Sequence, residues 1–179
     1  MANLVGGYFI IKGVEKVILI QEQLAKNRMI LEIDTKDRLC ASVTSSTAER
    51  KSKTTVYLKN RKMYMKHNTF TEDLPIGIVL RGMGLETDQE IVQLVGSEQM
   101  YTEGIAPSLH ECSQLQIYTQ EQALDFLGSK IKVSKNKKHF RPKSEEARDI
   151  LCQLVLNHIP VTRTDMKLKC IYLAKMLRS

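Results

Sequence analysis

The chain changes character at one stretch, Leu74-Pro75-Ile76-Gly77-Ile78-Val79-Leu80-Arg81-Gly82-Met83-Gly84. Before Pro75, short alternating or β-rich segments predict strands, and after it apolar residues recur with helical spacing. The run Ile76–Met83 is apolar and closes in a Gly-Met-Gly sequence, which predicts a short buried helix that ends at glycine. The sequence therefore predicts an α+β fold, with a small N-terminal β portion followed by a helical portion.

The segments upstream of Pro75 are short and β-rich. The alternating or β-branched runs that predict strands are Tyr8–Lys12, Arg28–Ile33 and Leu39–Thr44. Ser45–Ser52 is polar and predicts a loop. Thr54–Leu58 and Lys62–Lys66 are separated by a basic turn, and their many lysines favour a hairpin at the periphery of the fold.

The helical portion is marked by its N-terminal caps. Thr87–Glu90 and Thr119–Gln122 both have the capping-box pattern, in which the threonine hydroxyl and the third side chain each bond a free backbone amide. Ser144, followed by two glutamates, predicts a further helix start, because carboxylates are stabilised at the positive end of the helix dipole. Met166–Leu177 predicts the last helix. A chain that begins in a strand and ends in a helix is interpreted as part of a longer protein.

Length and composition favour one globular domain. The chain has 179 residues and a formal net charge of +7, from 27 basic and 20 acidic residues. This charge favours nucleic acid, an anionic membrane or an acidic protein as partner. Apolar runs are too short to span a bilayer, and no secretory signal is present, so we expect a soluble intracellular protein without a membrane partner.

The four cysteines lie far apart, without a Cys-x-x-Cys pair or a Cys-His cluster at ligand spacing. We therefore expect buried free thiols, no metal site and no cofactor in this segment. No nucleotide-binding fingerprint is complete, because Gly82-x-Gly84 lacks the third glycine. Cys112 and His110 are two residues apart and would point in different directions on a helix. We predict no catalytic residue.

The segment Ser129–Lys143 has the strongest bias in the chain, because it is rich in cations and contains no acidic residue. Its candidate DNA-binding residues are Lys130, Lys132, Lys135, Lys137, Lys138, Arg141 and Lys143. Two interpretations remain open: a solvated connector between two helices, or a basic loop that contacts phosphates or an acidic protein. Phe140 is its only aromatic residue, so contact with DNA would involve backbone phosphates and would not read sequence. A second basic group, between Arg50 and Lys66, is interpreted as ordinary solvated surface.

A long N-terminal run carries a resemblance to a known family. Gly6-Gly7-Tyr8-Phe9-Ile10-Ile11-Lys12-Gly13-Val14-Glu15-Lys16-Val17-Ile18-Leu19-Ile20-Gln21-Glu22 closely resembles a stretch of the second-largest subunits of cellular RNA polymerases. Leu74–Gly84, Ala123–Gly128 and Glu146–Leu151 are similar to later elements of that family, and Lys167–Leu177 is similar to its closing helix. The resemblance covers about residues 6 to 178. Within the family, the RNA polymerase III version is the most similar, through the residues at 21–28, 41–47 and 169–172.

The resemblance implies a nuclear segment called the lobe, which forms one wall of the DNA cleft. It implies one lobe domain over 1–179, with 6–22 at the junction with the neighbouring protrusion and 129–143 as a basic loop. It also implies that nucleotidyl transfer, with its Mg and Zn sites, resides elsewhere in the polymerase. The implied partners are DNA, the largest subunit, the rest of the second subunit, an initiation-factor-like heterodimer and a small zinc-ribbon subunit.

There are three alternatives to this interpretation. The chain could be the equivalent lobe of another nuclear or archaeal RNA polymerase. An independent basic DNA-binding module would be expected to contain a helix-turn-helix, a zinc finger or a stacking sheet, and none is recognisable. A small-molecule enzyme centred on Cys112 or a histidine has no supporting constellation of residues.

Overall fold

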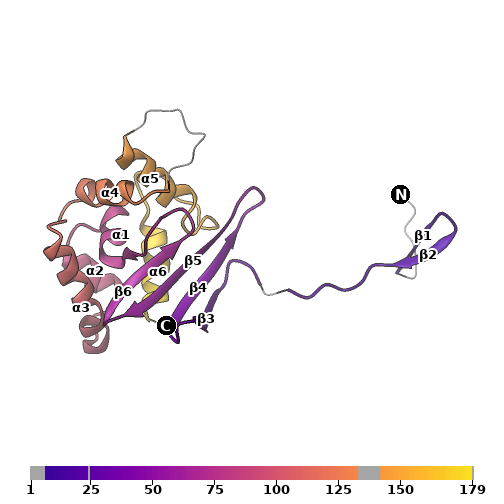
Figure 1. The fold of residues 1–179 in the computed structure, drawn as a ribbon, viewed down its shortest axis with the longest axis horizontal. Helices are drawn as coiled ribbons and strands as arrows, with labels where there is room; N and C mark the ends of the chain where they lie inside the picture. The colour runs from indigo at the N-terminus through magenta and orange to yellow at the C-terminus, as the bar shows by residue number, and fades with distance from the viewer. Residues whose placement is uncertain (1–6, 24, 133–141, 179) are drawn as a thin grey trace.

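The computed structural model describes residues 7–23, 25–132 and 142–178, and it confirms the predicted α+β fold (Figure 1). The strands are β1 (Tyr8–Ile11), β2 (Val14–Val17), β3 (Met29–Ile33), β4 (Leu39–Ser46), β5 (Lys51–Lys59), β6 (Lys62–His67) and β7 (Leu74–Pro75). The helices are α1 (Ile76–Gly82), α2 (Asp88–Val95), α3 (Gln99–Gln114), α4 (Gln120–Ser129), α5 (Lys143–Gln153) and α6 (Lys167–Arg178). None of these helices is long and apolar enough to cross a membrane.

Five strands form one antiparallel sheet in the order β3-β4-β5-β6-β7, and the helices pack on one of its faces (Figure 1). The prediction of a peripheral hairpin was wrong for β5, which is the central strand. Its residues alternate, so that Thr54 and Val56 are buried while Lys51 and Lys53 are exposed. The lysines therefore belong to the solvated face of a core strand.

The predicted loop Ser45–Ser52 is shorter in the structure, because β4 runs to Ser46 and β5 begins at Lys51. Polar contacts with the chain that follows α5 hold these strand ends. The Ser52 hydroxyl donates to the Leu154 carbonyl at 2.7 Å, and Ser45 Oγ lies 2.9 Å from Nδ1 of His158. Two serines that suggested a loop are thus buried at the seam between sheet and helices.

Both predicted capping boxes are confirmed. At the start of α2 the Thr87 hydroxyl accepts from the Glu90 amide, and at the start of α4 the Thr119 hydroxyl accepts from the Gln122 amide. By contrast, the bounds of α3 were not predicted, although His110 and Cys112 were expected on a helix, because α3 also contains Gly104 and Pro107. Burial of its apolar face compensates for this weak helix propensity.

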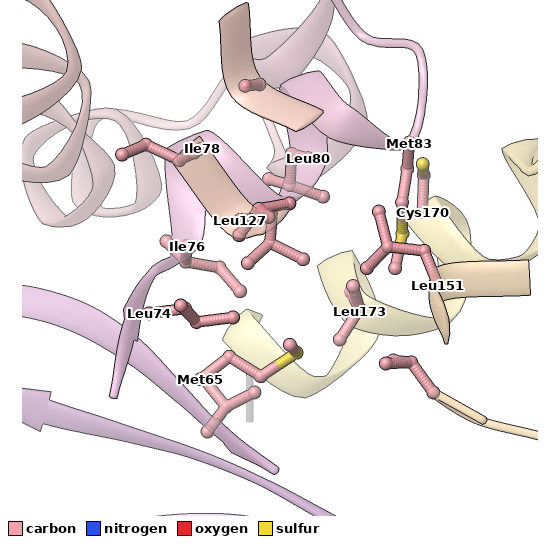
Figure 2. Close-up of a cluster of buried hydrophobic side chains, with 14 of the residues drawn as sticks. Met65, Leu74, Ile76, Ile78, Leu80, Met83, Leu127, Leu151, Cys170 and Leu173 are labelled. Atoms are coloured by element: carbon pink, nitrogen blue, oxygen red, sulfur yellow. The ribbon is translucent and has the colours of Figure 1, made fainter. Parts of the chain in front are cut away.

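The hydrophobic core lies between the sheet and the helices (Figure 2). Met65 of β6 and Leu74 of β7 face Leu127 of α4, Leu151 of α5 and Leu173 of α6, and all five are almost completely buried. The predicted buried helix α1 runs through the middle of this cluster, and its seven residues are all buried. The core therefore joins the β portion and the helical portion into one unit.

Two cationic side chains are buried in this unit and donate hydrogen bonds to backbone carbonyls. The Lys169 ammonium donates to the carbonyls of Leu151 at 3.0 Å and Cys152 at 2.7 Å, and also to the Val155 carbonyl. The first two carbonyls belong to the last turn of α5, where intrahelical donors run out, and Val155 follows the end of that helix. The Arg81 guanidinium donates to the Ile117 carbonyl and to the Asp88 carboxylate, and so links α1 to the start of α2.

The hairpin of β1 and β2 stands apart from the rest of the chain at the end of an extended linker (Figure 1). Its apolar side chains are exposed, and those of the linker are even more so, with Ile10 at 59% and Ile20 at 98%. Such a concentration of exposed apolar side chains is typical of a surface that another polypeptide covers. The assignment of residues 6–22 to a domain junction stays a prediction.

Candidate nucleic-acid interface

The basic segment Ser129–Lys143 connects α4 to α5, and the structure describes its two ends. Three of the seven predicted DNA-binding residues lie in the described ranges: Lys130, Lys132 and Lys143. The other four, Lys135, Lys137, Lys138 and Arg141, lie outside the described residues. The structure therefore describes how the two ends of the basic segment are held, at Lys130, Lys132 and Lys143.

Lys130 forms the C-terminal cap of α4 and is held by the turn that follows β6. Its carbonyl accepts from the Thr71 amide at 2.9 Å and from the Thr71 hydroxyl at 3.1 Å. Its ammonium pairs with the Glu72 carboxylate at 2.8 Å and lies 5.9 Å from the centre of the Phe126 ring. Because its charge is partly neutralised by Glu72, Lys130 is the least available of the three candidate DNA-binding residues.

The chain leaves Lys130 along a short β-bridge. Ile131 is buried and pairs with Phe70, and the Lys132 amide donates to the Thr69 carbonyl at 3.0 Å. The Lys132 ammonium donates to the Asn68 carbonyl at 2.9 Å. A carbonyl does not cancel the charge of an ammonium, so Lys132 still presents a positive charge where the segment begins.

Lys143 begins α5 at the other end of the segment, one residue before the predicted start at Ser144. Its backbone packs directly on Gly128 of α4, where a Cβ atom would lie 2.6 Å from the Lys143 carbonyl oxygen. Only glycine permits this approach. The side chain of Lys143 is exposed and has no ion-pair partner among the described residues. The packing of α4 on α5 therefore places Lys143 close to the end of α4, from which Lys130 and Lys132 follow.

The second basic group was interpreted as solvated surface, and this holds for only part of it. Arg50 donates to Gln153 at 3.1 Å, Lys53 pairs with Glu32 at 2.7 Å, and Lys62 pairs with Glu111 at 3.1 Å. Lys51, Lys59, Arg61 and Lys66 are exposed. The bonded members of the group join neighbouring strands and helices.

Cys112 and His110 do not form a nucleophile–base pair. Cys112 is completely buried, its thiol donates to the Ser108 carbonyl at 3.4 Å, and burial raises its pKa to about 11. His110 is exposed and lies against Gln114 on the same helix. All four cysteines are free thiols; Cys40, Cys112 and Cys170 are buried as expected, whereas Cys152 is half-buried. Among the residues described, no group of three or more His, Cys, Asp or Glu side chains could hold a metal ion.

Comparison with known proteins decides the family. The family described as RNA polymerase Rpb2, domain 2, matches residues 17–179. The chain belongs to this family. It is 58% identical over 176 residues to the RNA polymerase III subunit rpc2 of Dictyostelium discoideum and 52% identical to subunit RPC2 of Schizosaccharomyces pombe. Each of these matches covers 97% of the chain.

A more distant relative is the archaeal subunit Rpo2 of Sulfolobus acidocaldarius, which is 32% identical over 173 residues and 94% of the chain. The higher identity to RNA polymerase III subunits confirms the predicted lobe of an RNA polymerase III second subunit over the archaeal alternative. The chain spans 11% and 15% of the length of the Dictyostelium and S. pombe relatives. The Rpb2 domain 2 match begins at Val17, so β1 lies before it.

Proposed function

We propose that this Rpb2 domain 2 forms one wall of the DNA cleft of a nuclear RNA polymerase III and serves as a docking platform for accessory subunits. The observation that carries the proposal is its similarity, over 97% of its length, to second subunits of RNA polymerase III. The initiation-factor-like heterodimer and the small zinc-ribbon subunit are the proposed occupants of the platform. The largest subunit and the remainder of the second subunit are the proposed structural neighbours.

The chain is proposed to supply no catalytic residue and to contribute to the reaction only by forming part of the cleft that holds DNA. Its relatives are subunits of a DNA-directed RNA polymerase, and nucleotidyl transfer uses metal-bound carboxylates. We place those carboxylates, together with the Mg and Zn sites, in other parts of the polymerase. The substrate-contacting residues of the reaction would then lie outside this domain.

The basic segment Ser129–Lys143 is the proposed point of contact with DNA. Lys132 and Lys143 support this role, because they present positive charge at its two ends, where α4 packs on α5. Contacts of this kind would be to phosphates, so binding should depend strongly on salt and little on sequence. The segment would hold duplex DNA against the cleft wall without reading it.

Titration of fluorescent duplex DNA with the full-length second subunit, at several salt concentrations, tests the DNA contact. The triple variant Lys135→Glu, Lys137→Glu, Lys138→Glu should weaken binding equally for unrelated sequences. It should also flatten the plot of log affinity against log salt, by about 0.9 for each phosphate that the segment no longer neutralises.

A matched control is Lys51→Glu, Lys59→Glu, Lys66→Glu, which makes the same change of net charge at exposed positions of the sheet. We expect it to retain most of the salt dependence. Equal loss of binding by both triple variants would show that net charge alone attracts DNA, and unchanged binding by the first variant would remove the basic segment from the interface.

A further inference from the structure

One corner of the sheet has an apolar surface that nothing in the described chain covers. Ile33 of β3 pairs with Leu39 of β4, and Leu58 of β5 pairs with Met63 of β6. The pairing of β4 with β5 ends at Cys40 and Tyr57, and one further step in the same register places Leu39 opposite Leu58. Residues that lie opposite one another on neighbouring strands share a face of the sheet. These four side chains therefore form a continuous row across four strands, which we call the apolar row.

The row lies on the face that the helices cover elsewhere. In the next row along the strands, Ala41, Val56 and Met65 lie side by side and are at most 5% exposed. In the apolar row, exposure rises from partly buried Met63 to 50% at Leu58, 62% at Leu39 and 72% at Ile33. The helix layer thus ends at Met63, beside Gly104 of α3.

The dimensions of the uncovered row match a helix. Neighbouring strands are spaced about 4.8 Å apart, so Leu58, Leu39 and Ile33 span about 10 Å. A helix that crosses the strands presents apolar side chains at i, i+4 and i+7 about every 5.4 Å along its axis, close to this spacing. One further helix beside α3 would continue the helix layer over the corner.

The charges around the row indicate the character of that helix. The β5–β6 turn, next to Leu58, carries Lys59, Arg61 and Lys62 and no acidic residue. Lys62 is paired with Glu111, whereas Lys59 and Arg61 are exposed and have no ion-pair partner among the described residues. The turn at the other end, between β3 and β4, balances two acidic against two basic side chains. A helix that binds the row therefore needs acidic side chains only at the end that faces the β5–β6 turn.

We propose that the apolar row binds an amphipathic helix of another protein of the polymerase. Its apolar stripe would pack on Ile33, Leu39 and Leu58, and acidic side chains at one end would face Lys59 and Arg61. This inference rests on the proposed docking function and assigns it a surface. Buried apolar contacts in the centre would supply most of the affinity, and the charges at the rim would set the orientation.

Photocrosslinking in the purified polymerase identifies the occupant. A photoreactive phenylalanine analogue is placed at position 39 of the full-length second subunit, and a second polymerase carries it at position 171. Ile171 is the control because it is an exposed apolar residue, at 50%, that lies on α6 and not on a strand of the row. We expect position 39 to crosslink to a predicted amphipathic helix of another subunit, with Asp or Glu at one end. Crosslinks to DNA, to a second copy of this chain or to other parts of the second subunit would overturn the proposal.

Paired variants distinguish docking at the apolar row from docking elsewhere on the domain. Ile33→Asp with Leu39→Asp should reduce the crosslinked subunit in the purified polymerase at least about tenfold, whereas Ile171→Asp should leave it at the wild-type level. Lys59→Glu with Arg61→Glu should give a smaller loss, and this variant leaves every core residue in place. If accessory subunits crosslink at position 171 but not at 39, docking stands and the apolar row fails. If neither position captures a subunit, both proposals fail.

Discussion

Lys169 and Arg81 show how far single residues can be interpreted from sequence. Lysine and arginine usually lie at the surface, yet Lys169 is completely buried and Arg81 is 2% exposed. Lys169 is held by carbonyls at and just after the end of α5, and Arg81 by the Ile117 carbonyl between α3 and α4 and by the Asp88 carboxylate. Only the packed structure brings these groups together. The sequence carries no local signal for such contacts. The capping threonines, by contrast, were predictable because donor and acceptor lie three residues apart.

Gly128 gives a prediction at this scale. Gly128→Ala should destabilise the domain by about 2 to 3 kcal/mol, because the new Cβ would lie 2.6 Å from the Lys143 carbonyl oxygen and the α4–α5 contact must open. Chemical denaturation measures the change. Gly104→Ala is the control: its Cβ would lie 3.6 Å from the Met63 methyl, and alanine favours the helix by up to about 1 kcal/mol. An unchanged midpoint for Gly128→Ala would refute the close approach.

His67 makes stability depend on pH. Burial, with smaller contributions from the charges of Lys169 and Lys132, lowers its pKa from 6.5 to about 4. Between these values the unfolded chain binds a proton that the folded chain does not, so folding loses stability as the pH falls from about 6.5 to about 4. The loss attributable to this group is up to about 3 kcal/mol.

Denaturation of His67→Gln and wild type at pH 7 and pH 4.5 tests this assignment. The variant should lose less stability on acidification than the wild type, and His110→Gln, at an exposed position, should behave as the wild type. Parallel pH curves for His67→Gln and wild type would contradict it.

At the scale of elements, the sequence predicted those whose signals are local. The apolar run after Pro75 predicted α1, and alternation predicted strands close to β3 and β4. The failures have a common physical cause, which is that burial overrode local composition. The lysines of β5 concealed the central position of a predicted strand, and Gly104 and Pro107 concealed the extent of α3.

The hairpin of β1 and β2 is an element whose stability contribution can be measured. Its strands pair with each other, and their side chains are exposed. Deleting residues 1–22 from the 179-residue chain should therefore shift its Tm by less than about 2 °C and should reduce aggregation, because exposed apolar surface is removed. Calorimetry together with light scattering measures both effects. A large fall in Tm would show that the hairpin supports the core after all.

At the scale of the whole molecule, the fold class and family membership could be recognised from sequence, and so could the charge of the basic segment. The contacts at its ends could not, because Glu72 and Asn68 are far from Lys130 and Lys132 along the chain. The apolar row was equally hidden. Ile33, Leu39, Leu58 and Met63 become neighbours only through the strand register, which depends on the turns and on the buried face.

The central claim is that this domain acts as a wall and docking platform within an RNA polymerase III. The most direct test replaces the corresponding part of the 52% identical S. pombe subunit with residues 17–178 of this chain, in parallel with deletion of that part. The purified polymerases are compared for subunit content, duplex binding and transcription with termination. We predict that the replacement keeps all of these close to the wild type, and that the deletion loses accessory subunits and impairs assembly or termination. A deletion polymerase that assembles, binds DNA and terminates as the wild type does would contradict the account.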